Sequence, residues 1–84
     1  MTLAPTLTTL DTLGVGNSAT VIHLAPSAGG GDVSRRLMEL GFVPGERIRV
    51  LKRVPGGDPI AVKVGQSTFA LRRYEAALVS VSPE

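Results

Sequence analysis

The sequence contains no cysteine and no tryptophan, and its only aromatic residues are two phenylalanines and one tyrosine. Without cysteine there is no disulfide framework, no thiolate nucleophile and no thiolate metal site. A chain of 84 residues buries only about 60–65% of the surface that its unfolded form exposes, so it has little core to divide between two modules. We therefore expect one domain, at residues 7–82, preceded by a flexible tail at residues 1–6.

Long apolar runs are also missing. No run of apolar residues exceeds four, which excludes a transmembrane helix and the apolar region of a signal peptide. The first ten residues, MTLAPTLTTL, lack the positive charge with which a signal peptide begins. These absences predict a cytoplasmic protein.

Residues that commonly carry catalysis are few. His23 is the only histidine and the seven acidic residues are scattered, so neither a metal shell nor a pair of carboxylates for general acid–base catalysis stands out. Residues 14–19 (GVGNSA) match a dinucleotide-binding pattern, but a strand-like segment follows where that motif requires a helix. We predict a protein that is not an enzyme and uses no cofactor.

The hydrophobic pattern predicts a mainly β fold. Residues 33–40 (VSRRLMEL) read as a short helix with Val33, Leu37 and Leu40 on one stripe, ended by Gly41. Residues 72–77 (RRYEAA) read as a single helical turn. Five short strands joined by tight turns, with the helix inserted between the first and the second, indicate a strongly bent antiparallel sheet or barrel. These strands are expected at residues 20–24, 46–54, 60–64, 67–71 and 78–81.

Positive charge is concentrated after the first third of the chain. Residues 35–84 carry all nine Lys and Arg against five acidic residues, which leaves 9 − 5 = +4. Alternation along the second strand places Ile48 and Val50 on its inner face, and Arg47, Arg49 and Arg53 on its outer face. The outer face is either an ordinary solvated surface or a binding surface for an acidic protein, an anionic membrane or nucleic acid.

The connector after the helix is unusually apolar. Phe42 and Val43 precede a turn at Pro44-Gly45, and they either close the end of a small core or contact a partner. Both interpretations hold if the Phe42 ring is half buried. The candidate partner-binding residues are the connector and its basic and apolar neighbours: Met38, Phe42, Val43, Pro44, Arg47, Arg49 and Arg53.

Several segments in order resemble the FeoA family of small proteins from bacterial ferrous-iron uptake systems. They are RRLMELGFVPG (35–45), the basic strand RIRVLKRVP (47–55), the turn and strand GGDPIAVKV (56–64) and the final TFALRRYEAALVSV (68–81). The lead-in at residues 6–24 is similar to the family's opening as well. The loop before the helix, SAGGGD, departs from the family in being longer and richer in glycine.

The resemblance implies an SH3-like β-barrel with a helix after its first strand. It also implies a non-enzymatic role as a partner of the FeoB-type membrane transporter, bound to its cytoplasmic G-protein domain and therefore peripheral to the membrane. The alternative is the SH3-like domain of the iron-dependent repressors, acting in metal-linked regulation or nucleic-acid binding. Nucleic acid is disfavoured because only Tyr74 lies beside basic residues, so no stacking platform is present. Open sheet edges would also permit a homo-oligomer.

Overall fold

The computed structural model describes residues 8–25, 32–56 and 58–84. The tail expected at residues 1–6 and most of the glycine-rich loop at residues 25–31 lie outside this range. Within the described residues, no helix has the length and apolar character needed to cross a membrane.

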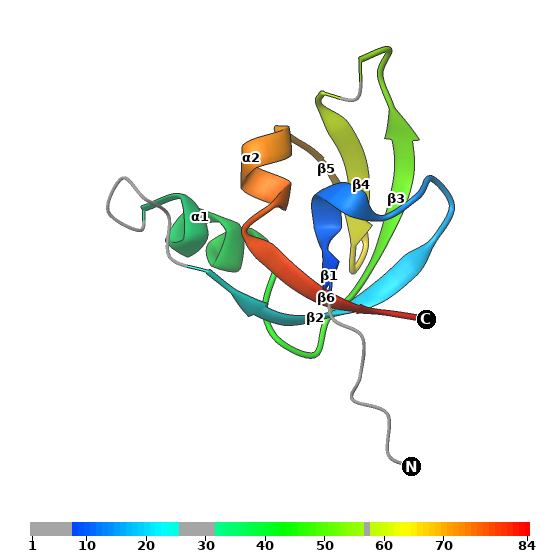
Figure 1. Ribbon diagram of the computed structural model, residues 1–84. Coiled ribbons are helices and arrows are strands. Elements are labelled where there is room, and N and C mark those ends of the chain that lie inside the picture. The colour runs from blue at the N-terminus through cyan, green and yellow to red at the C-terminus, as the bar shows by residue number, and fades with distance from the viewer. Residues whose placement is uncertain (1–7, 26–31, 57) are drawn as a thin grey trace.

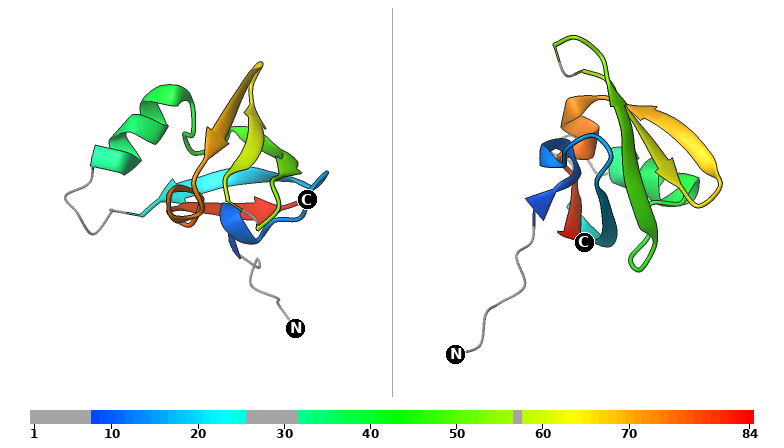
Figure 2. Two further views of the ribbon diagram at one scale, coloured as in Figure 1. Left: turned by 90° about the horizontal axis from the view of Figure 1, so that it is seen from above. Right: turned by 90° about the vertical axis from the view of Figure 1, so that its right-hand side faces the viewer.

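Six strands of the described part of the chain form one antiparallel sheet in the order β1-β6-β2-β3-β4-β5. The sheet bends strongly, so that β2 and β6 cross beneath β3, β4 and β5 (Figures 1 and 2). The strands are β1 (Thr8–Thr9), β2 (Ser18–Leu24), β3 (Arg47–Arg53), β4 (Ile60–Val64), β5 (Ser67–Leu71) and β6 (Val79–Pro83). The predicted mainly β fold is confirmed, and the strand missing from the prediction is the two-residue β1.

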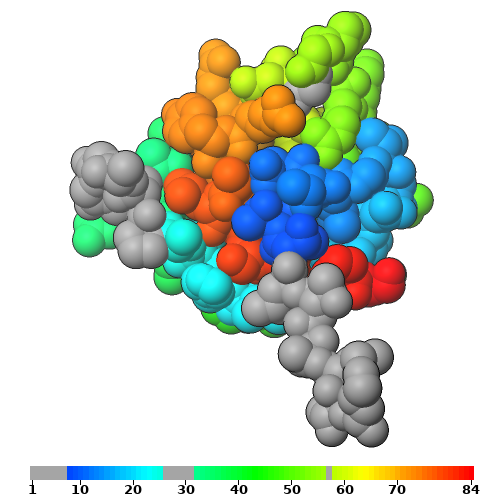
Figure 3. Space-filling model, viewed as in Figure 1, coloured from blue at the N-terminus to red at the C-terminus, as the bar shows by residue number. Residues whose placement is uncertain are grey.

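Among the described residues, three short helices accompany the sheet: the 3₁₀ turn η1 (Leu10–Thr12), α1 (Asp32–Leu40) and α2 (Arg73–Ala76). As predicted, α1 lies between the first long strand and the next, and residues 72–77 contain a single helical turn. On the face shown in Figure 3, η1, α2 and β6 adjoin one another. Leu10 and Ala76, which η1 and α2 contribute, are fully buried, so these short elements close one side of the core.

The core takes its residues from alternate positions of the strands. Ile48 and Val50 of β3 are buried, as the alternation predicts. The same holds for β4 and β6, whose inward positions are at most 5% exposed. The buried apolar residues are Leu10, Leu13, Ala19, Val21, Leu37, Phe42, Ile48, Val50, Ile60, Val62, Val64, Leu71, Ala76, Val79 and Val81.

A β-bulge in β3 reverses the predicted faces near the end of the strand. Val50 pairs with Val62 but Lys52 pairs with Ala61, so Leu51 is an extra residue. Directly opposed residues share a face; Lys52 therefore lies on the outer face, while Arg53, opposite the buried Ile60, lies on the inner one. The prediction that Arg53 shares the outer face with Arg49 is wrong for this reason.

A second bulge, at Ile22 in β2, has the same effect. The register passes from Val21↔Val81 to His23↔Ser80, so His23 is exposed on the outer face and Leu24 packs against the core. Simple alternation along the strand would place His23 on the same face as Val21, and the bulge prevents this.

The helix α1 ends as the sequence predicts but buries less than expected. The Gly41 N–H donates to the Met38 carbonyl at 3.1 Å and the Phe42 N–H to the Leu37 carbonyl at 3.0 Å, which is the Schellman arrangement. Gly41 has φ = +119°, a conformation that glycine adopts without steric cost. Of the predicted stripe, Leu37 is fully buried and Val33 packs on the core, whereas Leu40 is 41% exposed. Leu40 lies instead on a groove beside β5.

Candidate partner-binding surfaces

The Phe42 side chain is a core residue. It is fully buried and packs against Phe69 of β5, with ring centroids 5.8 Å apart. Its position follows from the Schellman arrangement, in which the second residue beyond the helix turns back towards the last turn. Because the ring has no exposed surface, a partner cannot contact it. Phe42 is therefore a core residue and not a contact residue.

The rest of the connector lies at the surface. Val43 is half-buried and Pro44 is exposed, and the Glu46 N–H donates to the Val43 carbonyl at 3.0 Å across the turn. The Gly45 N–H donates to the Val21 carbonyl at 2.8 Å, which fastens this turn to β2. Met38 is 46% exposed on α1. These residues remain available for contact.

Arg53 has a structural position. Its Nη2 donates to the main-chain carbonyls of Asp11 and Leu13 at 2.7 and 2.5 Å. These bonds fasten the segment around η1 to the end of β3, and the side chain is half-buried. Because the bulge turns Arg53 towards the inner face, it does not contribute to a basic outer surface.

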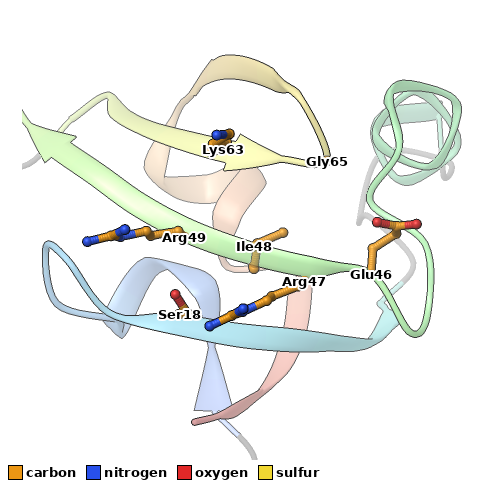
Figure 4. A pocket seen from close by; sticks show the side chains of 7 residues that line it. All are labelled: Ser18, Glu46, Arg47, Ile48, Arg49, Lys63 and Gly65. Carbon is orange, nitrogen blue, oxygen red and sulfur yellow. The ribbon is translucent and has the colours of Figure 1, made fainter.

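The outer face of β2, β3 and β4 carries a pocket of about 330 Å³ with basic walls. Arg47 and Arg49 extend from β3 in the same direction, with Ser18 on β2 and Lys63 on β4 to either side (Figure 4). Of the seven predicted site residues, Arg47 and Arg49 alone line this pocket. Its lining residues are Ser18, Glu46, Arg47, Ile48, Arg49, Lys63 and Gly65.

The cations of the pocket differ in how they are neutralised. Arg47 forms a two-pronged ion pair with Glu84, with Nε–Oε2 at 2.8 Å and Nη2–Oε1 at 2.9 Å. Arg49 lies directly opposite Lys63 in the β3–β4 register, and neither has an ion-pair partner among the described residues. Like charges in directly opposed positions destabilise a sheet. A binding site for an anionic group is the arrangement that would relieve this repulsion.

Sequence reasoning missed Lys63. Alternation along β4 places the Lys63 side chain outward, but only the strand register shows that it faces Arg49. The pairing follows once the two strands are joined as a hairpin, so the signal was present in the sequence but required the bulge to be located.

Candidate metal ligands are not clustered in the part of the chain that the structure describes. No three His, Cys, Asp or Glu side chains gather there in a way that could hold a metal ion. His23, the only histidine of the sequence, is exposed on β2 and belongs to no such group.

Comparison with known proteins gives consistent results. The family model described as "FeoA domain" matches residues 8–83. The crystal structure of FeoA from Stenotrophomonas maltophilia, complexed with zinc and described as a prokaryotic SH3 domain protein, is 42% identical, with a TM-score of 0.83 over 90% of this chain and 94% of that one. The bent sheet with its inserted helix is thus an SH3-like fold, as the resemblance implied.

Two larger proteins contain a similar domain. An Fe(2+) transport protein A/Fe(2+) transporter FeoB fusion protein from Porphyromonas gingivalis is 32% identical over 72 residues, which are 86% of this chain and 8% of that protein. A manganese-dependent transcriptional repressor aligns with a TM-score of 0.82 over 98% of this chain and 44% of its own, at 23% identity. At that identity the likeness concerns the fold alone.

Proposed function

This chain belongs to the FeoA family, and from that premise we propose that it is a non-enzymatic accessory protein of ferrous-iron uptake that binds the cytoplasmic side of a FeoB-type transporter. The fusion protein of Porphyromonas gingivalis supports this association, because its name joins an iron transport protein A to a FeoB transporter in one polypeptide. The matched segment is only 8% of that protein, so the proposal concerns association with the transporter and not transport itself.

The observation that carries the proposal is the unneutralised pair of Arg49 and Lys63 in the pocket on the outer sheet face. Their repulsion is relieved when an acidic group of the transporter enters between them. Exposed charges of this kind chiefly raise the association rate and fix the orientation of the complex. We therefore assign the basic pocket, with Arg49 and Lys63 at its centre, as the surface that recognises the transporter.

Nucleic acid is a less suitable ligand for this surface. Binding of single strands relies on aromatic rings on which bases stack. None of the three aromatic residues lines the pocket: Phe42 is buried, Phe69 packs against it, and Tyr74 belongs to α2.

The test is the affinity of the purified protein for the cytoplasmic region of its transporter, measured by calorimetry. The double variant Arg49→Glu/Lys63→Glu changes the net charge by four, as does the control Arg35→Glu/Arg73→Glu, whose side chains are exposed and do not line the pocket. We expect a loss of about tenfold or more for the first variant and a small change for the control, since local charge pairs outweigh net charge at short range. Equal losses in both variants, or none in either, would remove the basic pocket from the interface.

A further inference from the structure

One edge of the sheet is formed by β5, which pairs with β4 on one side only. The two-residue turn Gly65-Gln66 makes Val64 and Ser67 a hydrogen-bonded pair, and such pairs alternate along an antiparallel ladder. Phe69 and Leu71 therefore direct their N–H and C=O groups towards β4. The main-chain groups of Thr68 and Ala70 point to the open side, and both residues are exposed.

This edge lacks the charge, proline and bulge that commonly protect an exposed strand. Natural proteins protect such edges with charged side chains, proline, bulges or a covering element. The strand sequence STFAL contains no charge and no proline, and its pairing with β4 is regular. Among the described residues, no main-chain hydrogen bond occupies the outward groups of Thr68 and Ala70.

A groove of about 410 Å³ lies beside this edge, between α1, β5 and α2. In Figures 1 and 2, α1 lies on the side of β5 that faces away from β4. Leu40 and Tyr74, which are 41% and 60% exposed, line the groove together with the half-buried Phe69. The groove thus offers apolar surface next to unpaired strand backbone.

The charge around the groove is positive. Arg36 and Arg72 both line it and are exposed. The single acidic residue of its lining, Glu75, is 7% exposed and already bonded through Oε2 to Arg36 Nη2 at 2.5 Å and through Oε1 to the Arg72 N–H at 2.8 Å. A second copy of this chain paired with the β5 edge would add the same positive charges there. An acidic segment would instead complement the charges of Arg36 and Arg72.

We propose that the edge of β5 and the adjoining groove bind an extended, acidic segment of a partner protein, which adds a strand to the sheet. The added backbone bonds to the outward groups of Thr68 and Ala70, which is the β-augmentation mode of peptide recognition. Alternate aliphatic side chains of the segment enter the groove between Leu40 and Phe69, and a flanking carboxylate pairs with Arg72. This site is separate from the basic pocket and does not depend on the identity of the transporter.

The first experiment titrates the ¹⁵N-labelled protein with the capped peptide EELVLEE. Its controls are KKLVLKK and a form of EELVLEE that is N-methylated on the central backbone. We expect saturable shifts at the Thr68 and Ala70 amides, slower hydrogen exchange at both, and binding weakened by about tenfold or more in each control, as strand addition through backbone bonds requires. Absence of shifts at millimolar peptide, or equal binding of the lysine peptide, would overturn the proposal. A dimer that forms through β5 without peptide would overturn it as well.

A second experiment uses variants of the protein. Ala70→Pro removes an N–H that points away from β4, a position where an edge strand tolerates proline, so the fold should persist while peptide binding is lost. Should this variant fail to fold, Leu40→Glu provides the same test, because Leu40 is exposed and lines the groove. Its control is Met38→Glu, on the same helix, similarly exposed and outside the groove. Binding by Leu40→Glu as tight as by Met38→Glu would contradict the site.

Discussion

The rings of Phe42 and Phe69 lie with their centroids 5.8 Å apart and their planes tilted by 52°. This contact joins the connector after α1 to the edge strand β5. Tilted aromatic pairs at this separation contribute about 0.5–1.5 kcal/mol beyond the burial of their area. The apolar connector is thus explained by packing, and recognition of a partner falls to the surfaces around it.

Replacing Phe42 should therefore destabilise the protein. Truncation of a fully buried phenylalanine costs about 3–5 kcal/mol because burial is lost and a cavity remains. We expect Phe42→Ala to lower the free energy of unfolding by this amount in urea denaturation, and the control Met38→Ala, at an exposed position, to change it little. A Phe42→Ala protein of normal stability that fails to bind the transporter would show instead that the ring is a contact.

Two glycines of the same connector allow a matched comparison. Gly41 and Gly45 both have positive φ, at +119° and +94°. A Cβ at Gly41 would meet Val64 Cγ1 at 3.3 Å, whereas a Cβ at Gly45 would meet nothing within 4 Å. Both alanine variants should lose about 1–2 kcal/mol from the left-handed conformation, and Gly41→Ala should lose more. Equal losses in thermal unfolding would mean that the Val64 contact relaxes without cost.

Arg53 should behave as a stabilising residue. Its guanidinium donates to two carbonyls near η1. Hydrogen bonds that involve a charged group contribute about 1.5–3 kcal/mol. We expect Arg53→Met to lower the free energy of unfolding by roughly 1.5–3 kcal/mol while the transporter affinity of the folded protein stays the same. Loss of affinity without loss of stability would show that Arg53 contacts the transporter.

The fold was predictable from hydrophobic alternation wherever the strands are regular. The inward positions of β4 and β6 follow a strict period of two, so alternation alone identifies them. Alternation failed at Leu51 and Ile22, because a bulge adds one residue and reverses every face beyond it. No feature of the local sequence marks either position, since the bulges are set by pairing with the neighbouring strands.

The candidate site was predictable only in part. Arg47 and Arg49 lie before the bulge and were assigned to the correct face, whereas Arg53 lies beyond it. Phe42 was assigned two roles because its burial depends on β5, which is distant in sequence. The groove beside β5 requires the placement of α1 against the sheet, and periodicity within one segment carries no such information.

Substitution of Lys63 should affect the stability of the protein and its binding to the transporter in different ways. Lys63→Glu replaces a like-charge pair opposite Arg49 with an attractive one, and cross-strand charge pairs contribute about 0.2–1 kcal/mol. We expect this variant to unfold at the same or slightly higher urea concentration than the parent protein. A clear loss of stability would mean that Arg49 and Lys63 do not repel each other in the folded protein.

The central claim is that Arg49 and Lys63 form the surface that recognises the transporter. Its most direct test is the affinity of Lys63→Glu for the transporter's cytoplasmic region, measured at low and high salt on a preparation whose stability is known. We predict undiminished stability, an affinity reduced about tenfold at low salt, and a smaller difference from the parent protein at high salt because exposed charges are screened. An affinity equal to that of the parent protein at low salt would contradict the account.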